Sequence, residues 1–500
     1  MEKKLQQFKD ILAEVDDLDR ASAVLSWDQQ AFMPRGGAES RGNQMATLNR
    51  LSHERFVAKE TGKLLEDLET WAKGEDPDSD DARLVKVTRR LFDRKVKVPA
   101  EMVTEEAMLT TLGQEAWQEA RAKSDFALFR PNLEKLVDFA RRYAGLFAPY
   151  EHIYDPLLDA YEPGMKTAEV QEIFGGIRPK QVELIHAIAG QTQVDDALLH
   201  QHFPEAQQLE FGRDVVTAFG FDWQRGRQDK VTHPFMTNFG FGDQRITVRV
   251  NEDFFNPYLF AAMHETGHAL YEQGIPKSLE RSPIYGGASL GIHESQSRLW
   301  ENLVGRSKPF WEHFFPRLQQ VFPDQFGKAR LEDFYPAINR VAPSLIRVEA
   351  DEATYNLHIM LRLELEIALM EGSLEVKDLP GVWNETFSAY LGITPPDDAQ
   401  GVLQDVHWSA GLFGYFATYA LGNLISAQIW DVVTKALPEL DSQVRRGEFA
   451  PLLEWLQQNI YRHGAKFETQ EMVKKITGSK IDGGPYLRYL NAKFGEIYGL

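Results

Sequence analysis

Residues 256–274 read Asn-Pro-Tyr-Leu-Phe-Ala-Ala-Met-His-Glu-Thr-Gly-His-Ala-Leu-Tyr-Glu-Gln-Gly. The nearly continuous apolar side chains at its start predict a largely buried helix of roughly four to five turns. Asn256 is expected to be the N-cap, followed by proline in the first helical position, and Gly274 is expected to end the helix. His264 and His268 lie four residues apart, so this helix brings their imidazoles together on one face.

His264, Glu265 and His268 form a His-Glu-x-x-His arrangement. Imidazoles at this helical spacing can share one zinc ion at about 2.0–2.1 Å each. Glu265 follows the first histidine closely enough to reach a water molecule on that zinc, where it would act as general base and not as a ligand. The arrangement therefore predicts a zinc hydrolase, most simply a peptidase. The alternative is that both histidines are ordinary helix residues and Glu265 is a solvated carboxylate.

A catalytic zinc usually has three protein ligands and one open position, so a third ligand is expected elsewhere. Glu294 is the candidate, in a stretch expected to begin a second helix after the glycine-rich turn at residues 285–291. His293 and Glu301 are rival ligands. Glu294 could instead pair with Arg298, four residues later, on an exposed helix face. The side chains expected to orient Glu294 are Gln296, Ser297, Arg298 and Glu301.

Further short motifs occur along most of the chain. In chain order they are Ser26-Trp-Asp-Gln-Gln30 with Met33-Pro-Arg-Gly-Gly-Ala-Glu39, His233-Pro-Phe235, Asp243-Gln-Arg-Ile-Thr247, His293-Glu-Ser-Gln296, Ile346-Arg-Val-Glu-Ala-Asp351 and Gly401-Val-Leu-Gln-Asp-Val-His-Trp408. Together with the histidine motif they resemble, in type and order, the motifs of the carboxypeptidase Taq family of metallocarboxypeptidases. The resemblance favours Glu294 as third ligand over its rivals. It implies release of single C-terminal residues from peptides with broad side-chain preference, a divalent metal (Zn²⁺ or Co²⁺), a mostly helical fold and a homodimer.

A carboxypeptidase must recognise a free α-carboxylate, and a fixed guanidinium does this best. Arg347 lies in the largely apolar stretch 341–352, where a charge needs a partner, and the family resemblance favours it as the group that grips the substrate terminus. The alternative is a structural pair between Arg347 and Asp351, four residues later. Arg245 is the rival anchor, but its alternating surroundings predict a strand, and there it is expected to shape substrate access.

Polar and aromatic side chains after the turn at residues 394–398 are expected to line a pocket for the terminal residue. They are Gln404, Asp405, His407 and Trp408. Alternatively, Asp405 caps a helix and Trp408 belongs to the core.

Three side chains are candidates to donate a hydrogen bond to the oxyanion of the tetrahedral intermediate. His233 precedes a proline in an extended segment. Tyr415 and Tyr419 are expected to lie one helical turn apart, and their alternative role is buried aromatic packing.

The composition of the chain restricts the partners, catalytic groups and locations that it can have. The chain of 500 residues has a formal net charge of −19, which argues against nucleic acid or an anionic membrane surface as partner. It has no cysteine, which excludes a thiol nucleophile and a thiolate zinc ligand and suits the cytoplasm. No signal-peptide pattern is recognised at the N-terminus. Residues 406–430 carry no Asp, Glu, Lys or Arg, but their many polar side chains favour a buried helix over a membrane span.

Helical patterns dominate the chain, and the early ones cover Leu5–Leu25, Ala38–Leu68, Asp81–Lys95, Ala100–Lys123 and Phe129–Gly145. Strand signals concentrate in residues 230–250. We therefore expect a mainly α protein, a single large helical domain over residues 1–500 with a deep active-site cleft and a small β-sheet near the zinc helix. Residues 1–150 are expected to form a helical lobe that covers the cleft and limits access by large folded substrates.

Two other functions compete with a carboxypeptidase. A zinc endopeptidase or dipeptidase could use the same site. A silent peptide-binding or scaffold protein is the other, but a purely structural zinc site usually closes with a fourth protein ligand, and Glu265 would have no role in it.

Overall fold

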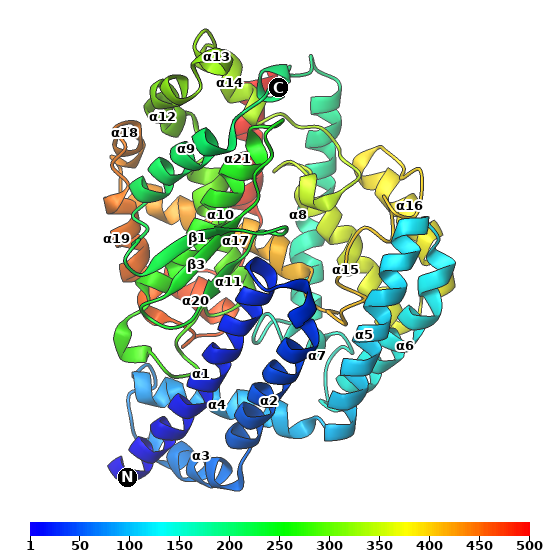
Figure 1. The fold of residues 1–500 in the computed structure, drawn as a ribbon, viewed down its shortest axis with the longest axis vertical. Coiled ribbons are helices and arrows are strands. Elements are labelled where there is room, and N and C mark those ends of the chain that lie inside the picture. The colour runs from blue at the N-terminus through cyan, green and yellow to red at the C-terminus, as the bar shows by residue number, and fades with distance from the viewer.

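The helix expected around the two histidines is α10 (Asn256–Gly274), and the other elements are arranged around it in the computed structural model, which describes residues 1–500 (Figure 1). The mainly helical fold with a small sheet is confirmed: there are 21 α-helices and one three-stranded sheet. The expected N-cap is wrong. Asn256 is the first helical residue, Phe255 occupies the cap position without a side-chain hydrogen bond, and Asn256 Oδ1 is buried without a partner.

Six helices form the N-terminal third of the chain. They are α1 (Glu2–Ala31), α2 (Ala38–Phe56), α3 (Lys59–Ala72), α4 (Asp80–Lys97), α5 (Ala100–Lys123) and α6 (Phe126–Gly145). The single helix expected over residues 38–68 is wrong, because the chain turns between Phe56 and Lys59. The turn folds α3 back against α1 and α4 and buries Leu64, Leu65 and Leu68, which a straight helix of that length would leave in solvent.

The remaining helices complete the helical body, and some of them pack directly against α10. They are α7 (Asp155–Leu158), α8 (Thr167–Ala189), α9 (Glu205–Ala218), α11 (Leu290–Arg298), α12 (Lys308–Val321), α13 (Pro323–Phe326), α14 (Leu331–Ile338), α15 (Tyr355–Glu371), α16 (Leu379–Leu391), α17 (Ala417–Ala436), α18 (Leu440–Arg445), α19 (Ala450–Asn459), α20 (Thr469–Thr477) and α21 (Gly484–Tyr498). Their buried apolar side chains join those of the N-terminal helices in one connected cluster of 119 residues.

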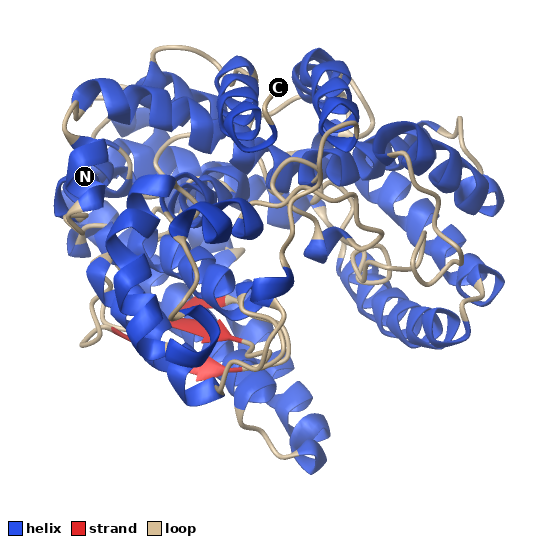
Figure 2. Ribbon diagram, turned by 90° about the horizontal axis from the view of Figure 1, so that it is seen from above, coloured by secondary structure: helices blue, strands red, loops and turns tan.

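The sheet consists of β1 (Gly226–Lys230), β2 (Met236–Asn238) and β3 (Gln244–Val248), and lies at one side of the helical body (Figure 2). Strand β3 is central, parallel to β1 and antiparallel to β2. Ile246 and Val248 of β3 are fully buried, and β3 packs against α10. The small sheet beside the histidine helix is therefore confirmed.

The uncharged segment 406–430 is only partly helical. Its first part forms turns in which Gly411 and Gly414 adopt positive φ angles of 72° and 92°, and α17 begins at Ala417. No helix in the structure combines the length and the apolarity that crossing a bilayer requires.

Helices α10, α11 and α17 approach one another closely at two glycines. A Cβ atom on Gly267 of α10 would lie 2.6 Å from the carbonyl oxygen of Gln296 in α11. A Cβ atom on Gly422 of α17 would lie 2.5 Å from Cγ of Glu294. Glycine is therefore required at both positions for α11 to sit between α10 and α17.

Substituting Gly267→Ala is expected to lower the free energy of unfolding by about 1–3 kcal/mol, because backbone atoms of α11 must move. Gly175→Ala is the matched control: Gly175 lies in α8, is exposed, and a Cβ atom added there would have no neighbour within 4 Å. There alanine is expected to stabilise by about 0.5–1 kcal/mol. Urea denaturation of the metal-free variants measures both, and equal effects would contradict the close approach.

Candidate metal centre

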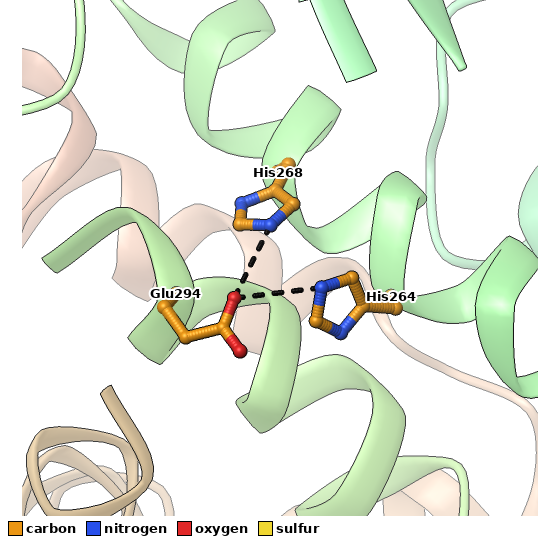
Figure 3. A group of neighbouring side chains, drawn as sticks. All are labelled: His264, His268 and Glu294. Carbon is orange, nitrogen blue, oxygen red and sulfur yellow. Dashed lines mark ion pairs between the residues drawn. The ribbon is translucent and has the colours of Figure 1, made fainter. Parts of the chain in front are cut away.

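His264 and His268 of α10 and Glu294 of α11 point toward a common centre (Figure 3). Glu294 Oε2 lies 3.4 Å from Nε2 of His264 and 3.4 Å from Nε2 of His268. One donor atom from each residue lies within 4.8 Å of the other two. Two imidazole nitrogens and one carboxylate oxygen are a donor set of catalytic zinc sites. The residues therefore fit a divalent cation, and the fold brings together the three side chains expected from the sequence.

Arg298 connects the carboxylates around His264. It donates from Nε to Glu294 Oε1 at 2.7 Å and from NH1 to Glu301 Oε2 at 3.1 Å. Glu301 Oε2 also lies 2.9 Å from Nδ1 of His264. The expected alternative, a pair between Glu294 and Arg298, is thus present, but it is buried and uses the oxygen of Glu294 that faces away from the histidines.

The far side of His268 contacts His293, whose Nδ1 lies 2.6 Å from Nδ1 of His268. His293 Nε2 lies 2.8 Å from Oε1 of Glu272. The two rival ligands, His293 and Glu301, thus contact the outer nitrogens of the paired histidines and do not join the three-residue group. Sequence reasoning missed Glu272, although it continues the four-residue spacing of His264 and His268 along α10.

Only some of the side chains expected to orient Glu294 do so. Ser297 donates from Oγ to Glu294 Oε2 at 3.0 Å, and Arg298 binds the other oxygen. The expectation for Gln296 is wrong, since its amide donates to Ser295 Oγ and makes no hydrogen bond to Glu294. Gln296 instead contributes the carbonyl against which Gly267 packs.

The charges of the cluster set its protonation. Burial opposes ionisation of Glu294, but Arg298, His264 and His268 together outweigh it and hold the pKa of Glu294 well below its ordinary range. Burial likewise opposes ionisation of Glu301, yet Arg298, His264 and Arg306 together lower its pKa to about 2. Burial lowers the pKa of His268 to about 3, so this imidazole is neutral. Burial opposes protonation of His264 too, but Glu294 and Glu301 raise its pKa, so a cation there would displace a proton.

Glu265 is 6% exposed, and no protein group donates a hydrogen bond to its carboxylate. Burial raises the pKa of Glu265 to about 7. A carboxylate with this pKa and no protein partner is suited to accept a proton and return it near neutral pH.

Arg347 is buried beside Asp405 and not beside Asp351. Its Nε and NH2 donate to Asp405 Oδ1 at 3.0 and 2.8 Å, and its NH1 donates to the Tyr355 hydroxyl at 2.9 Å. Asp351 accepts from backbone groups at Ala353 and Thr354, so the Arg347–Asp351 alternative is wrong. The expected helix cap by Asp405 is also wrong, because its second oxygen accepts from Arg362 Nε at 2.6 Å.

Gln404 has its polar atoms occupied by backbone groups. Its Oε1 accepts from the backbone N–H of Arg347 at 2.9 Å, and its Nε2 donates to the carbonyls of Leu345 and Gln400. It therefore positions the loop of Arg347. Trp408 is buried and donates from Nε1 to Glu366, which agrees with its alternative role in the core.

His407, Tyr415 and Tyr419 lie together. His407 Nε2 lies 3.2 Å from the Tyr419 hydroxyl, and the rings of the two tyrosines are 5.4 Å apart. The expected helical spacing of the tyrosines is wrong, because Tyr415 precedes α17. Burial raises the pKa of Tyr415, and the negative charge of Glu294 adds to this effect, so the two side chains are within electrostatic range.

His233 and Arg245 do not contact the three-residue group. His233 is exposed in the loop between β1 and β2, and no hydrogen bond or ion pair of its side chain reaches the centre. Arg245 of β3 binds Asp243 through two hydrogen bonds of 2.8 and 2.7 Å. Its guanidinium lies 4.2 Å from the ring of Trp27, so α1 covers this face of the strand.

A cavity of about 660 Å³ is lined by His293, the residue that contacts His268. Its wall also includes Lys86 and Arg90 of α4, Tyr161 and Leu290. Helix α4 thus contributes to a cavity that reaches His293, one side chain away from His268.

Arg298→Gln is expected to lower the free energy of unfolding by about 3–5 kcal/mol in EDTA, because Glu294 and Glu301 lose their buried counter-charge. The loss should be smaller in excess Zn²⁺, which would neutralise the same carboxylates. Arg330→Gln is the control, since Arg330 forms an exposed pair with Asp333 and should change little. Thermal and urea unfolding with and without metal test this, and a metal-independent loss would contradict it.

Comparison with known proteins places the whole chain in one family. Residues 7–494 match the model of the carboxypeptidase Taq (M32) metallopeptidase family. The chain is 44% identical to thermostable carboxypeptidase 1 of Thermus thermophilus over 95% of both chains, and 36% identical to carboxypeptidase 1 of Bacillus subtilis over 99% of this chain and 98% of that one. It superposes with a TM-score of 0.96 on the M32 carboxypeptidase of Deinococcus radiodurans, at 39% identity over the full length of both. The chain therefore belongs to the carboxypeptidase Taq family of metallocarboxypeptidases, which are peptide hydrolases.

Proposed function

We propose that this chain releases single amino acids from the carboxyl end of peptides, with His264, His268 and Glu294 holding a divalent cation, zinc or cobalt. Membership of a metallocarboxypeptidase family supports the reaction class. The observation that carries the metal assignment is the position of Glu294 Oε2, 3.4 Å from an Nε2 atom of each histidine. The buried guanidinium on its other oxygen leaves that donor directed at the centre.

A divalent cation at this site supplies Lewis-acid chemistry, which polarises the scissile carbonyl and lowers the pKa of water. Glu265 is proposed as the general base that accepts the proton of the attacking water. It then returns this proton to the departing amine. No protein group donates a hydrogen bond to the Glu265 carboxylate, and burial raises its pKa to about 7. Both observations support this role. No covalent acyl-enzyme is formed in this scheme.

Arg347 is proposed to bind the substrate carboxylate. A guanidinium has five N–H donors, and three of those on Arg347 go to Asp405 and Tyr355. The other two remain for a ligand, on a group whose position is fixed. Arg245 is already paired with Asp243, which supports its lesser role in shaping access.

The polar side chains near Glu294 are proposed to serve the oxyanion and the terminal residue. Tyr415 and Tyr419 are preferred as hydrogen-bond donors over His233, which lies in an exposed loop without contact to the centre. His407 is proposed to line the pocket for the terminal residue, where its ring packs against Tyr415 and Phe416. Broad side-chain preference stays a prediction.

The N-terminal 150 residues are proposed to act as a lobe over the site within one continuous domain. Support comes from α4, which lines the cavity next to His293, and from Arg20 of α1, which donates to the carbonyl of Asn238 at 2.8 Å. A homodimer and a cytoplasmic location stay predictions.

Glu265→Gln is expected to reduce kcat by about 10²–10⁴-fold, because the amide cannot accept the proton. Bound zinc, measured by elemental analysis, should be unchanged, since Glu265 is not a proposed ligand. Glu105→Gln, which removes a partly exposed carboxylate paired with Arg142, should leave both quantities at the wild-type level. Turnover that survives Glu265→Gln would exclude this base.

Blocking the substrate carboxylate as an amide is expected to reduce kcat/KM by about 10–100-fold, the loss of a charged hydrogen bond to Arg347. In Arg347→Gln the difference between free and amidated peptides should nearly disappear. Mass spectrometry of the products identifies the bond that is cut. An endopeptidase or a dipeptidase, the alternative on the same site, would show internal cleavage or act on dipeptides only.

A further inference from the structure

A hydrogen-bond network of three polar side chains, His293, Glu272 and Asn238, starts at Nδ1 of His268. Its Nδ1 lies 2.6 Å from Nδ1 of His293, and Nε2 of His293 lies 2.8 Å from Oε1 of Glu272. Oε2 of Glu272 accepts from Nδ2 of Asn238 at 2.5 Å. Every side chain of this network is at least partly buried, so water does not compete freely for these hydrogen bonds.

The direction of the hydrogen bonds follows from the metal assignment. If His268 binds a cation through Nε2, its single proton is on Nδ1. That proton is donated to Nδ1 of His293, which must then be unprotonated. The proton of His293 is therefore on Nε2 and is donated to Glu272. Each ring has one tautomer that satisfies all contacts, and the carboxylate of Glu272 accepts the proton of His293.

The ring of His293 is fixed by packing as well as by hydrogen bonds. Its centroid lies 5.2 Å from that of Tyr271. On another side it contacts Gly287, where a Cβ atom would lie 2.5 Å from Cδ2 of His293. Both Glu272 and His268 belong to α10, so His293 links α11 to two successive turns of that helix.

We propose that His293 and Glu272 are positioning residues for the metal centre, which hold His268 in the orientation and tautomer that presents Nε2 to the cation. The proposal rests on the metal site proposed above. His264 has a simpler arrangement, in which the carboxylate of Glu301 contacts its Nδ1 without an intervening residue. On the His268 side, Glu272 acts through an intervening imidazole.

The arrangement has two separable effects. The hydrogen bond from His268 to His293 fixes the ring, which lowers the cost of ordering it when the cation binds. The carboxylate of Glu272 polarises His293 and, through it, makes His268 a more basic ligand. Outer contacts of this kind typically change metal affinity by about 10–100-fold.

Three variants separate these effects. His293→Phe keeps an aromatic ring and removes both hydrogen bonds. His293→Asn places Oδ1 near the position of Nδ1 and can still accept from His268, but cannot reach Glu272. Glu272→Gln keeps an acceptor for His293 and removes the charge. Glu366→Gln is the control, because Glu366 is a fully buried carboxylate bound to Tyr154 and Trp408 that does not touch the centre.

The readouts are the zinc dissociation constant, from competition with a chromophoric chelator, and the visible absorption spectrum of the cobalt-loaded protein. His293→Phe should weaken zinc binding by about 10–100-fold and shift the cobalt bands. His293→Asn and Glu272→Gln should each weaken it less, and Glu366→Gln should not change either readout. Wild-type zinc affinity and a wild-type cobalt spectrum in His293→Phe would overturn the proposal. A zinc affinity that is higher in His293→Asn than in His293→Phe distinguishes positioning from a general loss of folding.

A background without His268 tests whether His293 acts through it. His268→Ala should itself weaken zinc binding, and adding His293→Phe to it should cost nothing further. An additional loss as large as in the wild-type background would overturn the proposal, since His293 would then bind the cation directly or act by another route. If His268→Ala binds zinc as the wild type does, the metal site itself is wrong, and the proposal falls with it.

Discussion

The close packing of α10, α11 and α17 is the constraint on which the rest of the centre depends. Glu294 reaches the two histidines because α11 lies between two helices that lack side chains at Gly267 and Gly422. A Cβ atom at either glycine would push α11 outward, and the carboxylate would lose its common position with the imidazoles. The small sheet supports the same arrangement from the other side, since β3 packs on α10. The backbone geometry therefore comes first, and the donor set follows from it.

Arg298 compensates the negative charge of the two buried carboxylates, so the helices can pack in this way without a bound metal. Glu294 and Glu301 are buried close together, and one guanidinium, that of Arg298, binds both. In a low-dielectric interior two such carboxylates could not both remain ionised without a cation nearby. Arg298 supplies that charge from the outer side and leaves Glu294 Oε2 facing the histidines. The centre is thus preorganised, and a divalent cation would complete a balance of charge that the protein has already largely established.

A second buried charge system organises the region proposed to recognise the substrate terminus. Asp405 joins Arg347 and Arg362, and the two arginines hold the pKa of Asp405 well below its ordinary range despite burial. Gln404 binds the backbone at Arg347, so segments some 57 residues apart are locked together. A guanidinium fixed in this way keeps free donors in a defined direction. The metal centre and the region proposed to recognise the substrate therefore share one physical feature, a buried arginine paired with carboxylates.

Sequence alone determined what depends on local spacing and composition. The helix of His264 and His268, the separate helix of Glu294, the small sheet and the mainly α class follow from periodicity, turn residues and motif order. Contacts between distant segments could not be predicted: the structural alternative for Arg347 pairs it with Asp351, four residues away, whereas its guanidinium binds Asp405. The break between α2 and α3, the contact of Glu272 with His293 and the contacts of Gln296 were missed for the same reason. Local pattern specifies a helix and the face its side chains share, whereas the choice of partner for a buried charge depends on which segments the packed core brings together.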